Sequence, residues 1–249
     1  GALLGPSYDD AAIAPALEAA GATFERAANE RAMLDATAER IAEGKVVGFF
    51  QGRMELGPRA LGSRSILADA RDPAMQTVLN EKIKLREAFR PFAPSVLRER
   101  AGELFEVPPG ADFAYMTITA DVKTELRIPQ PTFDASADFA ARAAAPRSPL
   151  PAITHLDHSA RVQTVDSDRH ALYHRLLEAF HARTGCPAIV NTSFNVRGEP
   201  IVRTPEEAIA CFLRTDMDAL VVGSFVLDKH AQREATVADA RRAPSFELD

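Results

Sequence analysis

The chain has 249 residues, a net charge of −6 and 46% hydrophobic residues, a composition that supports a domain with a substantial core. No apolar run reaches the roughly 20 residues that cross a bilayer, and the first residues lack a signal-peptide pattern, so we expect no membrane partner. Cys186 and Cys211 predict neither a disulfide framework nor a metal site, which favours a cytoplasmic protein.

Predicted helices and strands alternate along the chain, which indicates a mixed α/β fold. The first two helices are each followed by a glycine, Gly21 or Gly44, that predicts the helix end. The strands are short apolar runs, as in a buried sheet. The expected elements in chain order are helices over 9–20 and 29–43, strands over 45–50 and 65–68, helices over 73–83 and 171–183, a strand over 187–190, a helix over 205–213, and strands over 219–222 and 225–227.

Three segments give no single helix or strand prediction. Residues 82–86 alternate in hydrophobicity, so they could either end the preceding helix or form a strand. Residues 121–152 are rich in Ala, Pro and Asp with weak periodicity, and we interpret them as a loop-rich insertion. Residues 230–249 are polar, and we expect a loosely packed tail after a domain that spans residues 1–229.

Positive charge is concentrated in one part of this acidic chain. Residues 45–100 contain eleven Lys and Arg residues against six Asp and Glu residues. A basic segment in an acidic protein favours a local anion site. A nucleic-acid surface usually makes a whole domain basic, so we do not expect nucleic acid as a partner. A solvated charged face would give the same composition.

The segment 52–65 combines three glycines with three arginines, Arg53, Arg59 and Arg64. Glycines let backbone N–H groups approach a ligand, and a guanidinium group donates paired hydrogen bonds to phosphate or carboxylate. The spacing fits neither a P-loop nor a dinucleotide fingerprint. An anion-binding loop and a turn-rich connector with exposed arginines both remain open.

A second segment, 84–94, interleaves aromatic residues with the cations Lys84, Arg86 and Arg90. Pro91 and Pro94 favour extended chain and would make the segment rigid. This pattern predicts a shaped anion pocket, with a proline-rich surface turn as the alternative.

A third segment, 191–200, follows the predicted strand over 187–190 and carries Asn191, Ser193 and Asn195. Small hydroxyl and amide side chains at the end of a strand lie where open α/β sheets contact ligands. The alternative is a polar turn that binds nothing.

A fourth segment contains His155 and His158, followed by Arg161 and Gln163. Two histidines without further clustered ligands are usually ordinary hydrogen-bonded residues, so we predict no bound metal. Arg161 and Gln163 are two residues apart, so a strand would present both side chains on one face.

Together these segments resemble the C-terminal half of the NodU/CmcH carbamoyltransferase family. The resemblance extends in order over roughly residues 4–229, and one departure is His158, where the family usually has glycine. It implies a YrdC-like fold, in which a twisted α/β sheet with flanking helices surrounds a concave basic cavity. The sequence segments that match the family lie at 4–10, 52–71, 80–97, 155–165 and 191–208.

The resemblance also implies a half-reaction. This half of the family makes carbamoyladenylate from carbamoyl phosphate and ATP, with Mg²⁺ accompanying the ATP and no metal held tightly by the domain. A separate, metal-containing N-terminal half then transfers the carbamoyl group to a hydroxyl acceptor. A domain that only binds a nucleotide or anion, for regulation or docking, is the alternative. Binding of structured RNA, as in YrdC relatives, is a weaker one.

Because the reaction brings two anions together, we assign the clustered cations and the neighbouring polar side chains to hold them. Lys84-x-Arg86 and Ser193-x-Asn195 also match two signatures of YrdC-like domains. The assigned residues are Arg59, Lys84, Arg86 and Arg90 as phosphate and carbamoyl anchors, Arg53, Arg64 and Arg161 as further cations of the same cavity, and Asn191, Ser193 and Asn195 as hydrogen-bonding groups.

Overall fold

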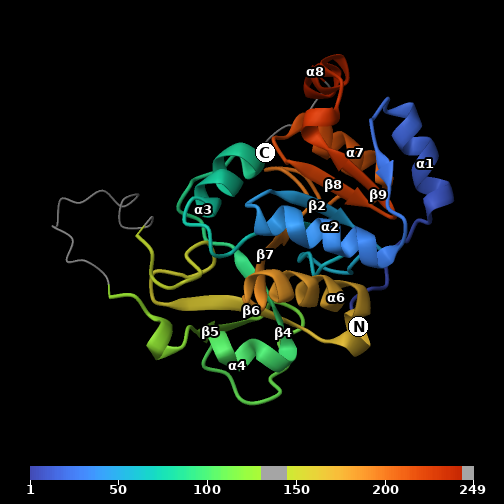
Figure 1. Cartoon of the computed structure of the whole chain (residues 1–249). Helices are drawn as coiled ribbons and strands as arrows, with labels where there is room; N and C mark the ends of the chain where they lie inside the picture. Colours follow the sequence, from blue (N-terminus) through green and yellow to red (C-terminus); the bar gives the residue numbers. More distant parts are fainter. Residues whose placement is uncertain (130–144, 243–249) are drawn as a thin grey trace, which may run out of the picture.

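The computed structural model describes residues 1–129 and 145–242, whose strands join in one mixed sheet (Figure 1). The sheet has nine strands in the order β1-β9-β8-β2-β3-β7-β4-β6-β5. The pairs β2–β8 and β4–β6 are parallel, and the other neighbours are antiparallel. The strands are β1 (Glu25–Arg26), β2 (Val47–Phe50), β3 (Arg64–Ala68), β4 (Ala93–Leu97), β5 (Ile118–Asp121), β6 (Ser159–Val165), β7 (Ala188–Ser193), β8 (Ala219–Val222) and β9 (Phe225–Asp228).

Helices pack on this sheet and complete the core. Helices α2 and α6 lie side by side and contact the central strands, while α7 packs on β2 and β8 and also contacts α1 and α8 (Figure 1). The central strands β2 and β8 are buried along their whole length, as expected for strands that are covered by helices. The helices are α1 (Asp10–Ala19), α2 (Glu30–Ala42), α3 (Met75–Thr77), α4 (Ala101–Leu104), α6 (Ser167–Thr184), α7 (Pro205–Arg214) and α8 (Glu234–Arg242).

Local sequence signals explain where most helices begin and end. Asp9, Asn29 and Thr204 each accept a backbone N–H at the start of α1, α2 and α7. Gly185 ends α6 in the left-handed conformation, with φ of 71°. The mixed α/β class is therefore confirmed, together with the predicted helices over 9–20, 29–43, 171–183 and 205–213.

The segment 73–86 is helical but irregular. Helix α3 continues into a wide π-helical turn, η1 (Val78–Lys84), and Leu85 then reverses the chain with φ of 50°. The strand considered over 82–86 does not form, because this left-handed residue interrupts any extended run. Wide helical turns of this kind are often found at functional sites.

Among the described residues after residue 229, where we expect a loosely packed tail, only Gln232 is buried, and α8 has no buried residue. Gln232 is buried, accepts a hydrogen bond from the Thr23 backbone N–H at 2.9 Å, and donates to the Thr23 carbonyl at 2.7 Å. Lys229 donates to the carbonyls of Phe212 and Leu213 at the end of α7, and α8 follows. Gln232 thus attaches the start of this segment to the chain just before β1, while residues 243–249 lie outside the described part.

The expected insertion over 121–152 is partly described. It begins at the end of β5 and includes a short helical turn, η3 (Thr124–Leu126), and a buried stretch around Ser148 and Leu150. Residues 130–144 lie outside the described residues. Among the residues that are described, no helix is long and apolar enough to span a membrane.

Candidate functional site

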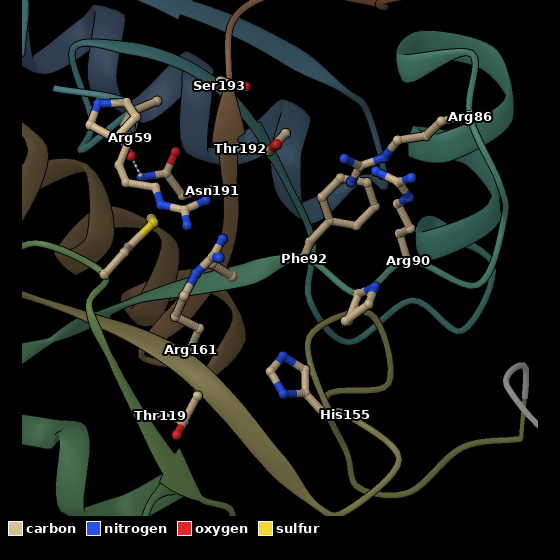
Figure 2. Close-up of a pocket in the computed structure, with 15 residues that line it drawn as sticks. Arg59, Arg86, Arg90, Phe92, Thr119, His155, Arg161, Asn191, Thr192 and Ser193 are labelled. Carbon is tan, nitrogen blue, oxygen red and sulfur yellow. Dashed lines mark hydrogen bonds between the residues drawn. The ribbon is translucent and has the colours of Figure 1, made fainter. Parts of the chain in front are cut away.

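A cavity of about 460 Å³ opens beside β6 and β7, and its wall carries four arginines, Arg59, Arg86, Arg90 and Arg161. The loop before β3, the segment before β4 and strand β6 supply these residues (Figure 2). No Asp or Glu is found among the described residues that line this cavity. In Figure 2, Arg59 and Arg161 extend toward the same space, and Arg86 and Arg90 lie together near Phe92.

A smaller cavity of about 220 Å³ adjoins the first. Arg86, Arg90 and Ser193 line both, and the smaller cavity adds Lys84 and Asn195. The two cavities therefore form one groove with a continuous row of donors. The structure thus brings together eight of the ten assigned residues, namely Arg59, Lys84, Arg86, Arg90, Arg161, Asn191, Ser193 and Asn195.

The arginines are held close together at an electrostatic cost. Burial lowers the pKa of Arg161, and the nearby charge of Arg59 lowers it further. Burial also lowers the pKa of Arg86, with a further contribution from Arg90. Only Arg90 among these four has an ion pair in the described structure, to Glu87 at 2.9 Å. Such a set of like charges, of which Arg86 and Arg161 are partly buried, is suited to bind a phosphate-bearing anion, which would remove the repulsion.

The loop that carries Arg59 is organised by a buried carboxylate, Glu55. Its Oε1 accepts backbone N–H groups from Leu61 at 2.7 Å, Ser63 at 2.6 Å and Arg64 at 3.2 Å. Sequence reasoning missed this role, although Glu55 is the single acid between the glycines and arginines of segment 52–65. The carboxylate fixes the loop without facing the cavity.

Removal of this carboxylate gives our first prediction. Glu55→Ala should lower the free energy of unfolding by about 2–4 kcal/mol, because three buried backbone donors lose a charged acceptor. It should also weaken phosphate binding, since Arg59 would lose its fixed position. Urea denaturation and calorimetry measure the two effects. Normal stability of the variant would contradict the role that we give to Glu55.

A glycine is required in the same loop. Gly62 has φ of 109°, and a Cβ atom there would lie 2.3 Å from the ring of Tyr173 in α6. The loop therefore packs directly on the helix, with no space for a side chain.

A second buried network lies behind the cavity. Asn191 donates to Gln163 Oε1 at 2.9 Å and to Ser95 Oγ at 3.0 Å, and Gln163 donates to the Leu61 carbonyl at 2.8 Å. These bonds join β7, β4 and β6 to the loop that carries Arg59. As predicted, β6 presents Gln163 and Arg161 on one face, with Gln163 in the network and Arg161 in the cavity wall.

The turn that carries Arg86 and Arg90 has its own anchor, Asn80, which is completely buried. Its amide donates to the carbonyls of Ala88 at 3.0 Å and Arg90 at 2.8 Å, and its Oδ1 accepts from Arg86 Nε at 2.7 Å. The Arg86 guanidinium also lies over the Phe92 ring, 5.0 Å from its centroid. Nothing in the sequence pattern distinguishes Asn80 from an ordinary helical residue.

Lys84 joins the two assigned signatures into one unit. Its Nζ donates to the Ser193 carbonyl, to the Asn195 carbonyl at 2.9 Å and to Asn195 Oδ1 at 2.8 Å. Ser193 Oγ donates to the same Asn195 oxygen at 2.7 Å. Burial lowers the pKa of Lys84 to about 7. Lys84 therefore holds the Ser193–Asn195 loop, while Arg86 two residues later faces the groove.

The structure does not bring Arg53 and Arg64 to the cavity, in contrast to their assignment from sequence. Arg53 lies on the surface and donates to the Leu4 carbonyl at 2.8 Å. Arg64 is fully buried on β3 and stacks on Phe50, 3.6 Å from the ring centroid. Its guanidinium donates only to backbone carbonyls in the described structure, namely those of Pro6, Gln51, Gly52 and Ser63. Arg64 therefore secures the N-terminal segment.

The histidine segment forms a tight turn at the cavity wall. His158 has φ of 62°, which explains why glycine would be favoured there and shows that the turn also accommodates histidine. His155 lines the cavity, and its Nδ1 lies 2.9 Å from Ser159 Oγ. No cluster of three or more potential metal ligands comes together within residues 1–129 and 145–242.

Comparison with known proteins identifies relatives over most of the chain. Residues 38–229 match the family described as Carbamoyltransferase C-terminus. An uncharacterised protein of Synechocystis sp. is 49% identical over all of this chain and 40% of its own length. Nodulation protein NolNO of Sinorhizobium fredii is 44% identical over 77% of this chain and 25% of its own length.

A solved structure, full-length HypF in its phosphate- and nucleotide-bound form, is similar at a TM-score of 0.45 and 16% identity. The match covers 82% of this chain and 22% of HypF. The chain thus spans no more than 40% of the length of these three proteins.

Proposed function

Because the chain belongs to the carbamoyltransferase C-terminus family, we propose that it activates carbamoyl phosphate with ATP to form carbamoyladenylate. The observation that supports this proposal is the groove, where four arginines line a cavity without an acidic side chain among its described lining residues. Carbamoyl phosphate and ATP are both polyanions, so fixed cations are the main requirement for bringing them together.

The two cavities suggest where each ligand binds. The larger one, with Arg59 and Arg161, has room for the carbamoyl phosphate, and Asn191 and Ser193 contribute polar groups to its wall. The smaller one, with Lys84 and Asn195 beside Arg86 and Arg90, would hold phosphates of the nucleotide. Mg²⁺ would accompany the ATP, bound mainly by phosphate and water.

In this reaction water first cleaves carbamoyl phosphate to carbamate and inorganic phosphate. A carbamate oxygen then attacks the α-phosphorus of ATP, which forms carbamoyladenylate and releases pyrophosphate. The arginines stabilise the charge that develops on the phosphate oxygens, and no covalent bond to the protein forms. Arg86 and Arg90 line both cavities, so they can contact both reacting groups. The protein thus acts by positioning and charge stabilisation.

The remainder of the longer relatives would complete the process. We propose that an N-terminal, metal-containing half transfers the carbamoyl group from the adenylate to a hydroxyl acceptor. The groove itself offers cations and polar groups for activation.

The isolated chain provides the test. Incubation with ATP, Mg²⁺ and carbamoyl phosphate should release pyrophosphate, because all groups proposed for activation are present. Omission of carbamoyl phosphate should abolish the release, and no hydroxyl compound should become carbamoylated. Binding of ATP with no pyrophosphate release would instead favour a domain that only binds nucleotides, and carbamoylation of an acceptor would contradict the division of labour.

A further inference from the structure

We propose that His155 recognises the amino group of the carbamoyl moiety by accepting a hydrogen bond from its N–H at Nε2. The inference rests on the proposed function and adds a determinant of substrate specificity to it. His155 would allow the groove to distinguish carbamoyl phosphate from acyl phosphates that have the same charge and shape but lack an N–H.

The hydrogen bonds of the turn determine which ring nitrogen is free. Ser159 Oγ donates its single proton to Asp157 Oδ1 at 2.7 Å, and Asp157 also accepts the Ser159 backbone N–H at 3.0 Å. Ser159 Oγ can therefore only accept from His155 Nδ1, 2.9 Å away. Neutral His155 consequently carries its proton on Nδ1, and Nε2 is left with a lone pair.

The surroundings of the ring favour its neutral form. Burial lowers the pKa of His155, the charge of Arg161 lowers it further, and Asp157 acts in the opposite direction. The imidazole remains half-buried at the wall and extends toward the cavity in Figure 2.

This lone pair complements the rest of the wall. The guanidinium groups can only donate hydrogen bonds, and the Asn191 amide nitrogen donates to the buried network behind the cavity. A ligand of oxygens alone would place no donor opposite His155 Nε2. Carbamoyl phosphate has acceptor oxygens for the arginines and a donor amide for the histidine, so it fits both kinds of group.

Two stable phosphonates isolate this contact. Phosphonoacetamide and 2-oxopropylphosphonate have nearly the same shape and charge, but the first ends in NH₂ and the second in CH₃. Calorimetry on the full chain should show that phosphonoacetamide binds about tenfold more tightly, as expected for one hydrogen bond to a partly buried acceptor. Equal binding of the two compounds would overturn the inference alone, whereas binding of neither would overturn the proposed phosphate site as well.

Variants in the turn show whether His155 is responsible. His155→Phe should bind both phosphonates alike, and His155→Gln, which restores an acceptor, should recover part of the preference. The matched control is His158→Gly, in the same turn but outside the cavity lining, which should keep the full preference. A His155→Phe protein that retained the tenfold difference would contradict the assignment.

Discussion

Arg161→Ala should lower carbamoyl-phosphate-dependent pyrophosphate release by about a hundredfold or more, the loss expected when one fixed donor is removed from a developing charge. Arg161 lines the cavity, is half-buried and has no ion-pair partner in the described structure. Its charge is therefore available to a bound anion. Removal of this charge should also relieve the repulsion with Arg59, so the thermal midpoint should not fall.

The rate of pyrophosphate release and the thermal midpoint should be measured together. Arg31→Ala is the matched control, because the Arg31 side chain is 91% exposed and its one ion pair in the described structure is to Asp35. An Arg161→Ala protein with normal activity would remove Arg161 from the proposed site. A large loss of stability would indicate a structural role instead.

Lys84→Ala should affect both activity and stability. The Lys84 ammonium is buried among oxygens of Ser193 and Asn195, which would lose their donor. We expect the free energy of unfolding to fall by about 3 kcal/mol, the scale for buried polar groups left without a partner. Pyrophosphate release should fall below detection, because the Ser193–Asn195 loop would no longer be fixed beside Arg86.

Two further variants separate charge from volume. Lys84→Met retains most of the side-chain volume and should lose activity as Lys84→Ala does, since the missing group is the donor. Lys82→Ala, at an exposed position two residues before Lys84, should leave stability and activity nearly unchanged. Activity retained by Lys84→Met would show that the lysine only fills space.

The sequence predicted the fold wherever local pattern and tertiary packing favour the same structure. The apolar runs at 45–50 and 219–222 became the buried neighbours β2 and β8, and the helices predicted over 9–20 and 29–43 formed within these bounds. The contact between Gln232 and Thr23 was not predicted, because the two residues are more than 200 positions apart in the chain. No local sequence pattern predicts a contact over this separation.

The candidate site was likewise predicted only where local sequence determines the structure. Arg59 and Arg64 belong to one motif, yet Arg59 faces the cavity and Arg64 is buried on β3 among backbone carbonyls. Composition indicates that a segment can bind an anion, but the direction of each side chain depends on the strand register and on distant partners. Glu55 and Asn80 were missed for a related reason, since both position other groups and neither lines the two cavities.

The sharing of one wall by two cavities has a kinetic consequence. Arg86, Arg90 and Ser193 line both the larger and the smaller cavity. Under the proposed function, each of the two anionic substrates uses donors that the other also requires. Turnover should then be greatest at a balanced ratio of the two substrates, and an excess of either one should inhibit it.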